Sequence, residues 1–183
     1  MPRRPEPAER DYVDQMLEEW GRERPDLDLS PLGIFGRISR VSRHFDREIS
    51  KKFRAEGMTT WAFYVLAALA RSGAPYQMTP TDLYRSLLVS SGVMTNRIAR
   101  LERMGLVKRV PDPADGRGVG VALTAKGKRA VNVAIEHHNQ NEHEMLSPLT
   151  PGEREAMASS LRKLLREAGD QPHTRLRPPS RAR

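Results

Sequence analysis

Apolar side chains recur along most of the chain at steps of three and four residues, which is the spacing of an amphipathic helix. The pattern predicts a short helix at about Tyr12–Arg22, a long helix from Pro31 to near Gly57, and a third helix from Thr59 or Thr60 to Ala70. It also predicts two long helices in the last third of the chain, capped by Thr124 and Thr150. The chain is therefore predicted to be mainly α-helical.

Two short helices and a hairpin are predicted between these long segments. Thr79-Pro80-Thr81-Asp82 combines a capping hydroxyl, a proline at the first helical position and an acid in the first turn, and this helix ends near Leu87. Ser90 or Ser91 caps the next helix, which ends near Met104 before Gly105. Alternating apolar residues on either side of the turn-rich 111–116 segment then predict a β-hairpin. Helix, turn, helix and hairpin together predict a winged helix-turn-helix fold.

The second short helix separates its side chains onto two sides. Met94, Ile98 and Leu101 gather on one side. The opposite side is small and polar, and it carries Gly92, Asn96, Ala99, Arg100 and Arg103, with Thr95 at its margin. Such a side suits a DNA major groove, because small residues permit close approach while Asn and Arg offer hydrogen bonds to bases or phosphates. We predict Thr95, Asn96, Arg100 and Arg103 as DNA-binding residues; an ordinary solvated helix face is the alternative.

Charge is unevenly distributed along the chain, whose formal net charge is +8. Residues 78–129 contain ten Lys or Arg against four acids, whereas the first thirty residues contain five Arg against nine acids. A basic centre indicates a polyanionic partner such as double-stranded DNA, although a solvated basic surface is the alternative. In the hairpin turn, Arg117 beside Asp115 is predicted to enter a narrow minor groove, unless the turn only improves solubility.

Composition and motifs argue against several classes of protein. The chain has no cysteine, which excludes disulfides and thiolate metal sites. Its apolar runs are too short to cross a bilayer and none follows the basic N-terminus, so we expect a cytoplasmic protein with no membrane partner. No phosphate loop, paired carboxylates or nucleophile elbow is found, so we expect no enzyme, catalytic residue or cofactor. The spacing of His137, His138 and His143 does not favour a metal site.

Three short motifs carry a family resemblance. They are Thr-Asn-Arg-Ile-Ala-Arg-Leu-Glu from Thr95, Asp-Pro-Ala-Asp-Gly-Arg-Gly from Asp112, and Ala-Leu-Thr-Ala-Lys-Gly from Ala122. Together they resemble the multiple antibiotic resistance regulator (MarR) family of winged helix proteins, over about Pro31 to Ala168. The resemblance implies a homodimer held by the first long helix and the last two, with each winged domain on half of a pseudo-palindromic site. Gly116 departs from the family pattern, which usually has a second Arg there.

The segment from Glu18 to Pro31, with its extra helix, resembles the branch of this family that responds to urate or related anions. That branch binds its ligand with a Trp, an Asp and two Arg. The resemblance places the Trp at Trp20 and the two Arg at Arg97 and Arg109, and Tyr64 occupies the position of the Asp. The helical wheel independently places Arg97 beside the buried stripe, where an anionic ligand or an internal acid would pair with it. We predict these four residues as a site for a small anionic or aromatic ligand, such as a urate-like purine or a phenolic compound.

The predicted organisation follows from these elements. It comprises a disordered tail (1–10), an extra helix and linker (11–30), dimerisation helices (31–57 and 124–168), a winged helix DNA-binding domain (58–123) and a disordered basic tail (169–183). The predicted function is a ligand-responsive transcription regulator, acting as a repressor. Two alternatives are a constitutive or architectural DNA-binding protein without a ligand, and a small-molecule binding protein without a DNA function.

Overall fold

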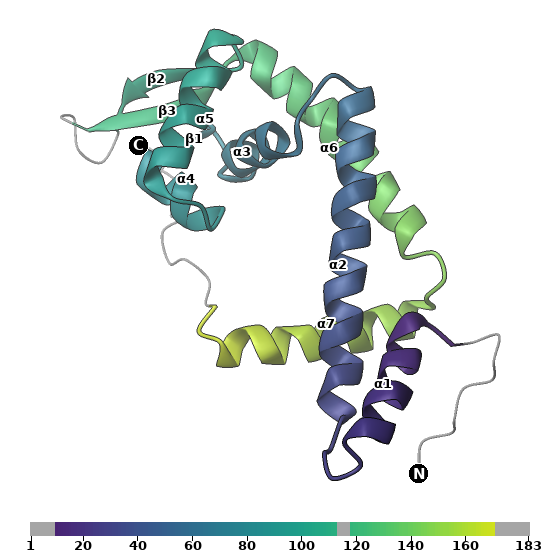
Figure 1. Ribbon diagram of the computed structural model, residues 1–183. Helices are drawn as coiled ribbons and strands as arrows, with labels where there is room; N and C mark the ends of the chain where they lie inside the picture. The colour runs from purple at the N-terminus through teal and green to yellow at the C-terminus, as the bar shows by residue number, and fades with distance from the viewer. Residues whose placement is uncertain (1–9, 113–117, 171–183) are drawn as a thin grey trace. The chain divides into compact units, whose positions relative to one another are not determined.

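The computed structural model describes residues 10–112 and 118–170 of the chain. These residues form two compact units, one up to Glu48 and the other from Ile49, with one helix running through the boundary. The elements in chain order are α1 (Tyr12–Glu23), α2 (Ser30–Ala55), α3 (Thr60–Arg71), β1 (Gln77–Met78), α4 (Pro80–Ser86), α5 (Ser91–Arg103), β2 (Val107–Pro111), β3 (Val119–Leu123), α6 (Ala125–Met145) and α7 (Pro151–Glu167) (Figure 1).

In the first unit, α1 packs against the first half of α2. Val13 is buried, and Gly36 leaves room for it, since a Cβ added at Gly36 would lie 3.1 Å from Val13 Cγ1. Arg37 fixes the pair by donating from Nε to Asp11 Oδ2 and from Nη2 to Asp14 Oδ1, both at 2.8 Å. Asp11 also caps α1 by accepting from the backbone N–H groups of Val13 and Asp14. One acid therefore begins the helix and holds it to its neighbour.

The second unit is built around α3, whose side chains Phe63, Val65, Leu66 and Leu69 are all buried. Burial on more than one side of α3 agrees with its apolar sequence. Each neighbouring element contributes a fully or almost fully buried residue to the same core: Leu83 from α4, Met94, Ile98 and Leu101 from α5, Val121 from β3 and Val131 from α6. Buried side chains of α4 and α5 therefore attach the helix-turn-helix to this core.

Three short strands form one antiparallel sheet in the order β1-β3-β2. Strands β2 and β3 pair along their whole length, from Val107 opposite Leu123 to Pro111 opposite Val119. Strand β1 adds only Gln77 opposite Ala122 and Met78 opposite Val121. The predicted fold class, mainly α with a small β wing, is confirmed, and β1 enlarges the predicted hairpin to three strands.

Helix boundaries agree with the sequence pattern to within one or two residues. Ser90 is the cap of α5, accepting from Val93 N at 3.4 Å. Thr124 and Thr150 cap α6 and α7 as predicted. Thr59 occupies the N-cap position of α3, but its side chain makes no capping hydrogen bond. Most of the two predicted disordered tails, residues 1–9 and 171–183, lies outside the described residues.

Apolar side chains remain exposed on several helices. They are Ile34, Phe35, Ile38 and Val41 on α2, Val133 and Ile135 on α6, and Met157, Leu161, Leu164 and Leu165 on α7. Helix α7 has no buried residue at all. None of the helices in residues 10–112 and 118–170 combines the length and apolarity that a bilayer crossing requires.

Candidate nucleic-acid interface and adjoining pocket

A short turn sets the orientation of α5 relative to α4. Thr79 begins α4 by accepting from Asp82 N at 3.1 Å. The turn passes through Leu88, which has a φ of +52° and a side chain that is 88% exposed. Backbone hydrogen bonds from Leu88 N to Arg85 O and from Val89 N to Tyr84 O close it. The helices on either side of the turn, α4 and α5, both bury side chains in the core. Close packing therefore fixes the orientation of α5.

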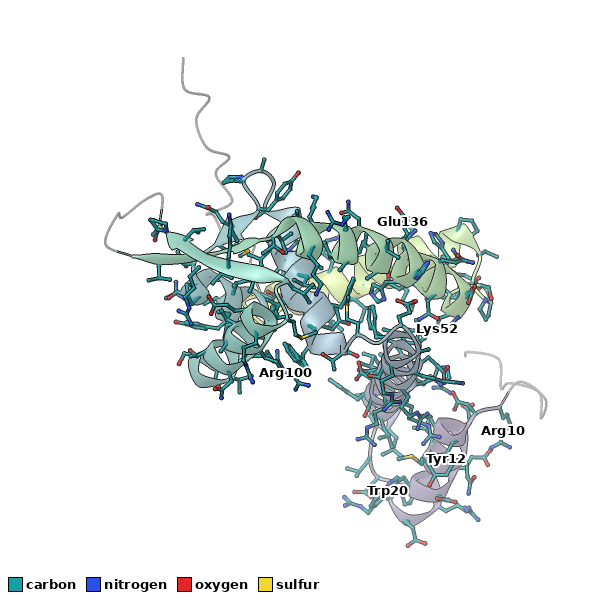
Figure 2. All side chains as sticks on the ribbon, turned by 90° about the horizontal axis from the view of Figure 1, so that it is seen from above. Arg10, Tyr12, Trp20, Lys52, Arg100 and Glu136 are labelled. Atoms are coloured by element: carbon teal, nitrogen blue, oxygen red, sulfur yellow. The ribbon has the colours of Figure 1, made fainter. Side chains whose placement is uncertain are left out.

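The structure places four predicted DNA-binding residues on the exposed side of α5. Thr95, Asn96, Arg100 and Arg103 are all exposed, while Met94, Ile98 and Leu101 on the opposite side are buried. Arg100 is labelled on this helix in Figure 2. The hydroxyl of Thr95 donates to Ser91 O at 3.0 Å, so in this structure it is engaged with its own helix.

Val93 lies on the same side of α5 as Asn96, Arg100 and Arg103, and sequence reasoning missed it. Its side chain is 42% exposed. The helical period alone could have placed Val93 on this side, because it precedes Arg100 by seven residues, which is about two turns. Arg117, the predicted minor-groove residue, lies outside the described residues.

An open pocket of about 520 Å³ adjoins this helix. Nine residues line it: Ser50, Arg54, Thr59, Thr60, Trp61, Tyr64, Leu87, Val89 and Arg97. Two of the nine are arginines, two are large aromatic residues and none is acidic. Such a lining favours an aromatic or anionic ligand, because guanidinium groups pair with carboxylates while rings provide stacking surfaces.

The structure brings together two of the four predicted ligand residues, Tyr64 and Arg97, on the wall of this pocket. Arg109 is not among its lining residues, and its Nε lies 3.2 Å from Glu102 Oε2 in a half-exposed ion pair. Trp20 belongs to α1 in the first unit and is 50% exposed (Figure 2).

Trp61 and Arg54 were missed as pocket residues. Trp61 precedes Tyr64 by three residues, so the helical period alone places the two rings on one side of α3. Trp61 also faces two cations, since its ring centroid lies 5.8 Å from Arg97 Cζ and 5.5 Å from Arg100 Cζ.

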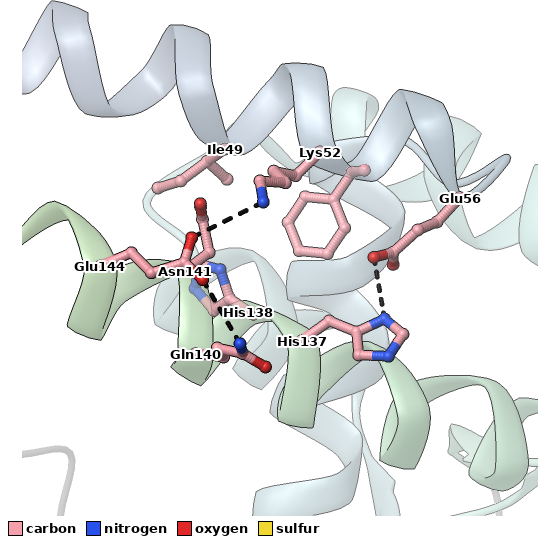
Figure 3. A pocket seen from close by; sticks show the side chains of 9 residues that line it. Ile49, Lys52, Glu56, His137, His138, Gln140, Asn141 and Glu144 are labelled. Carbon is pink, nitrogen blue, oxygen red and sulfur yellow. Dashed lines mark hydrogen bonds and ion pairs between the residues drawn. The ribbon is translucent and has the colours of Figure 1, made fainter.

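A smaller cavity of about 180 Å³ lies between the end of α2 and α6 (Figure 3). His137 Nδ1 lies 2.9 Å from Glu56 Oε1, and Lys52 Nζ lies 3.7 Å from Glu144 Oε2. His138 is buried against the rings of Phe53 and Phe63, and its Nε2 lies 3.2 Å from Glu142 Oε1. In the part of the chain that the structure describes, no three His, Asp or Glu side chains are close enough to hold a metal ion.

These features define a winged helix DNA-binding protein. Residues 56–118 match the family model described as MarR family. Over 142 residues the chain is 37% identical to the HTH-type transcriptional regulator PecS of Dickeya dadantii, covering 78% of this chain and 86% of PecS. The chain belongs to the MarR family of DNA-binding transcription regulators, which are not enzymes and of which some respond to ligands.

Solved structures of this family include complexes with operator DNA. One is a cysteine-to-serine mutant of Escherichia coli MarR bound to operator DNA. The similarity covers 85% of this chain and 99% of the MarR chain, with a TM-score of 0.64 and 25% identity. Bordetella bronchiseptica BpsR, whose DNA binding is regulated by 6-hydroxynicotinic acid, is similar in fold over 76% of this chain and 94% of that chain, with a TM-score of 0.63 and 24% identity.

Proposed function

We propose that this chain is a repressor that binds a pseudo-palindromic operator as a homodimer and is released from it by a small anionic or aromatic ligand. The observation that carries the proposal is the division of α5, in which Met94, Ile98 and Leu101 are buried and polar side chains are exposed on the opposite side. Thr95, Asn96, Arg100 and Arg103 are the proposed DNA contacts on this helix, and Arg117 is the proposed minor-groove contact.

The exposed apolar residues of α2, α6 and α7 support a dimer. These helices contribute ten large apolar side chains that are at least 38% exposed. Exposed apolar side chains gathered on a helix mark an association surface in soluble proteins. A twofold dimer would present two α5 helices to successive major grooves, with half-sites about 34 Å apart.

The roles of the α5 residues are tested by DNA affinity across sequences and salt concentrations, with a duplex that the protein selects from a random pool. Asn96→Ala should relax base preference at one position, because a base contact discriminates between sequences by about 1–3 kcal/mol. Arg103→Ala should weaken binding to all sequences and lower the salt slope by about 1, and Arg117→Ala should mainly weaken binding. Arg162→Ala, on α7, is the matched control. Relaxed preference in the arginine variants, with uniform weakening in Asn96→Ala, would reverse the assignments.

The pocket beside α5 supports a ligand response. Tyr64 and Arg97 are proposed ligand contacts, joined by Trp61 as a stacking surface and Arg54 as a second cation. Ligand binding to the folded state should raise the melting temperature, so a thermal screen with urate, xanthine, phenolic acids and 6-hydroxynicotinic acid identifies a ligand class. No shift with any of these anions would favour the constitutive regulator.

Arg97→Ala should lower the affinity for an anion that the screen selects by about tenfold or more, since a hydrogen bond to a charged group contributes about 1.5–3 kcal/mol. Isothermal titration calorimetry measures the change, with Arg103→Ala as the control. Equal affinity in wild type and Arg97→Ala would remove Arg97 from the site. Trp20 and Arg109 remain predicted contacts. For Arg109 to bind a ligand it must leave Glu102, so Glu102→Gln should then raise ligand affinity and Arg109→Ala should lower it.

A further inference from the structure

One side chain, Trp61, is shared by the pocket and the exposed side of α5. It is the second residue of α3, is half-buried and lines the pocket. Arg97 and Arg100 are three residues apart on α5, and both guanidinium groups approach the Trp61 ring, at 5.8 and 5.5 Å. Arg97 also lines the pocket, whereas Arg100 is exposed on the proposed DNA side.

Arg97 and Arg100 share the indole ring of Trp61 as a cation–π partner. Among residues 10–112 and 118–170, neither Arg97 nor Arg100 forms an ion pair or a side-chain hydrogen bond, and the nearby acid Glu102 is paired with Arg109. A cation within about 6 Å of a Trp centroid is attracted by the negative face of the ring. Two guanidinium groups on one ring also repel each other, so each weakens the attraction between the ring and the other guanidinium.

We propose that Trp61 is a positioning residue that couples the ligand pocket to the DNA-reading side of α5 through Arg97 and Arg100. This inference rests on the proposed function. An anion in the pocket draws Arg97 off the ring and neutralises it, which leaves the ring to Arg100. Arg100 is then held against Trp61 and away from DNA, and DNA affinity falls. By thermodynamic reciprocity, bound DNA lowers the affinity of the pocket for its anion by the same factor.

The first test needs no ligand, because Trp61 fluorescence reports on its own contacts. The chain has two tryptophans, so a Trp20→Phe protein has Trp61 as its single emitter. Saturation with a duplex selected from a random pool should change the emission, because DNA takes Arg100 off the ring. The change should be lost in Arg100→Ala and retained in the matched control Arg103→Ala. An equal emission change in Arg100→Ala and Arg103→Ala would overturn the proposal.

The second test separates coupling from simple charge loss. Arg97→Ala imitates the removal of Arg97 from the ring and should lower DNA affinity about two- to fivefold more in the Trp61 protein than in a Trp61→Leu background, the factor that one cation–π contact provides. A plain charge effect would be equal in both backgrounds, and that result would overturn the coupling. Trp61→Phe, which keeps a ring, should restore part of the difference.

Separate measurements test whether each variant is folded and whether the wild-type protein binds DNA, so that neither failure is mistaken for a loss of coupling. Thermal unfolding of each variant checks that Trp61→Leu is folded, and the fluorescence test keeps Trp61 in place in every protein. DNA binding with additive effects of the Trp61 and Arg97 substitutions would reject the coupling and leave the proposed function intact. Failure of the wild-type protein to bind any selected duplex would reject the proposed function itself.

Discussion

Gly127 lies beneath the carbonyl of Leu106, where the first turn of α6 meets the start of β2. A Cβ added at Gly127 would lie 1.9 Å from Leu106 O and 2.9 Å from its carbonyl carbon, whereas ordinary contact begins at 3.4 Å. Gly127→Ala therefore requires the helix and the strand to separate by about 1.5 Å. The neighbouring atoms are backbone, so no side-chain rotation relieves the contact.

The cost follows from the hydrogen bonds that hold this junction. Thr124 donates from Oγ1 to Gly105 O at 2.7 Å and from N to Leu106 O at 3.1 Å, and it accepts from Gly127 N at 3.0 Å. Loss of two or three of these bonds costs about 1 kcal/mol each, and overpacking adds about 1–3 kcal/mol. Alanine recovers about 1 kcal/mol through its better helix propensity. We expect a net loss of about 2–5 kcal/mol in the free energy of unfolding.

Urea unfolding followed by circular dichroism at a fixed protein concentration measures this loss as a lower midpoint with an unchanged slope. The matched control is Gly152→Ala in the first turn of α7, where an added Cβ has no atom within 4 Å. That variant should be as stable as wild type or more stable by up to about 1 kcal/mol, because it gains helix propensity without the backbone contact. Equal stability of the two alanine variants would refute the close approach of α6 and β2.

Three further predictions concern the helix ends and the association surface. The backbone N–H of Asp11 and the Arg37 guanidinium hold the pKa of Asp14 below its ordinary value of 3.8, so the stability that this carboxylate provides is present above pH 3.8 and is lost as the pH falls through the lowered pKa. Melting temperatures between pH 5 and pH 2.5 should therefore fall more steeply in wild type than in Asp14→Asn, and parallel curves would contradict this. Thr79→Ala should cost about 1 kcal/mol in urea unfolding and Thr79→Ser much less, because only the alanine removes the cap of α4. If α7 forms part of the proposed dimer surface, Leu164→Glu should shift dissociation of that dimer to higher protein concentration in sedimentation experiments, since Leu164 is 55% exposed in the single chain; an unchanged midpoint would contradict a role of α7 in association.

The helices were predictable from the sequence because local signals specify them. Ser90, Thr124 and Thr150 each make the side-chain hydrogen bond that their position predicts, and the helices begin at the next residue. Strand β1 could not be predicted, since two residues are too short to show alternation and their partner, β3, lies more than forty residues further along the chain. Thr59 shows the limit of local signals, because its buried hydroxyl has no partner among the described residues.

The candidate site was predictable only in part, for a related reason. The side of a helix on which a residue lies is a local property, which is why Asn96, Arg100 and Arg103 were assigned to the exposed side of α5. Which residues face one another across two elements is a tertiary property. The approach of Arg97 and Arg100 to the Trp61 ring and the pairing of Arg109 with Glu102 therefore could not be anticipated, although the place of Trp61 beside Tyr64 on α3 is a local property.

The burial of α5 limits how a ligand in the pocket could act on DNA binding. Met94, Ile98 and Leu101 are at most 2% exposed, so bending this helix would open the packed core of the second unit. A close-packed interior resists such deformation, whereas a half-buried arginine changes its contacts at little cost. Two routes then remain open to a pocket ligand: movement of the whole winged unit as a body, or rearrangement of side chains that reach from the pocket to the exposed side. Only the second route depends on Trp61, which is why the Trp61→Leu background distinguishes them.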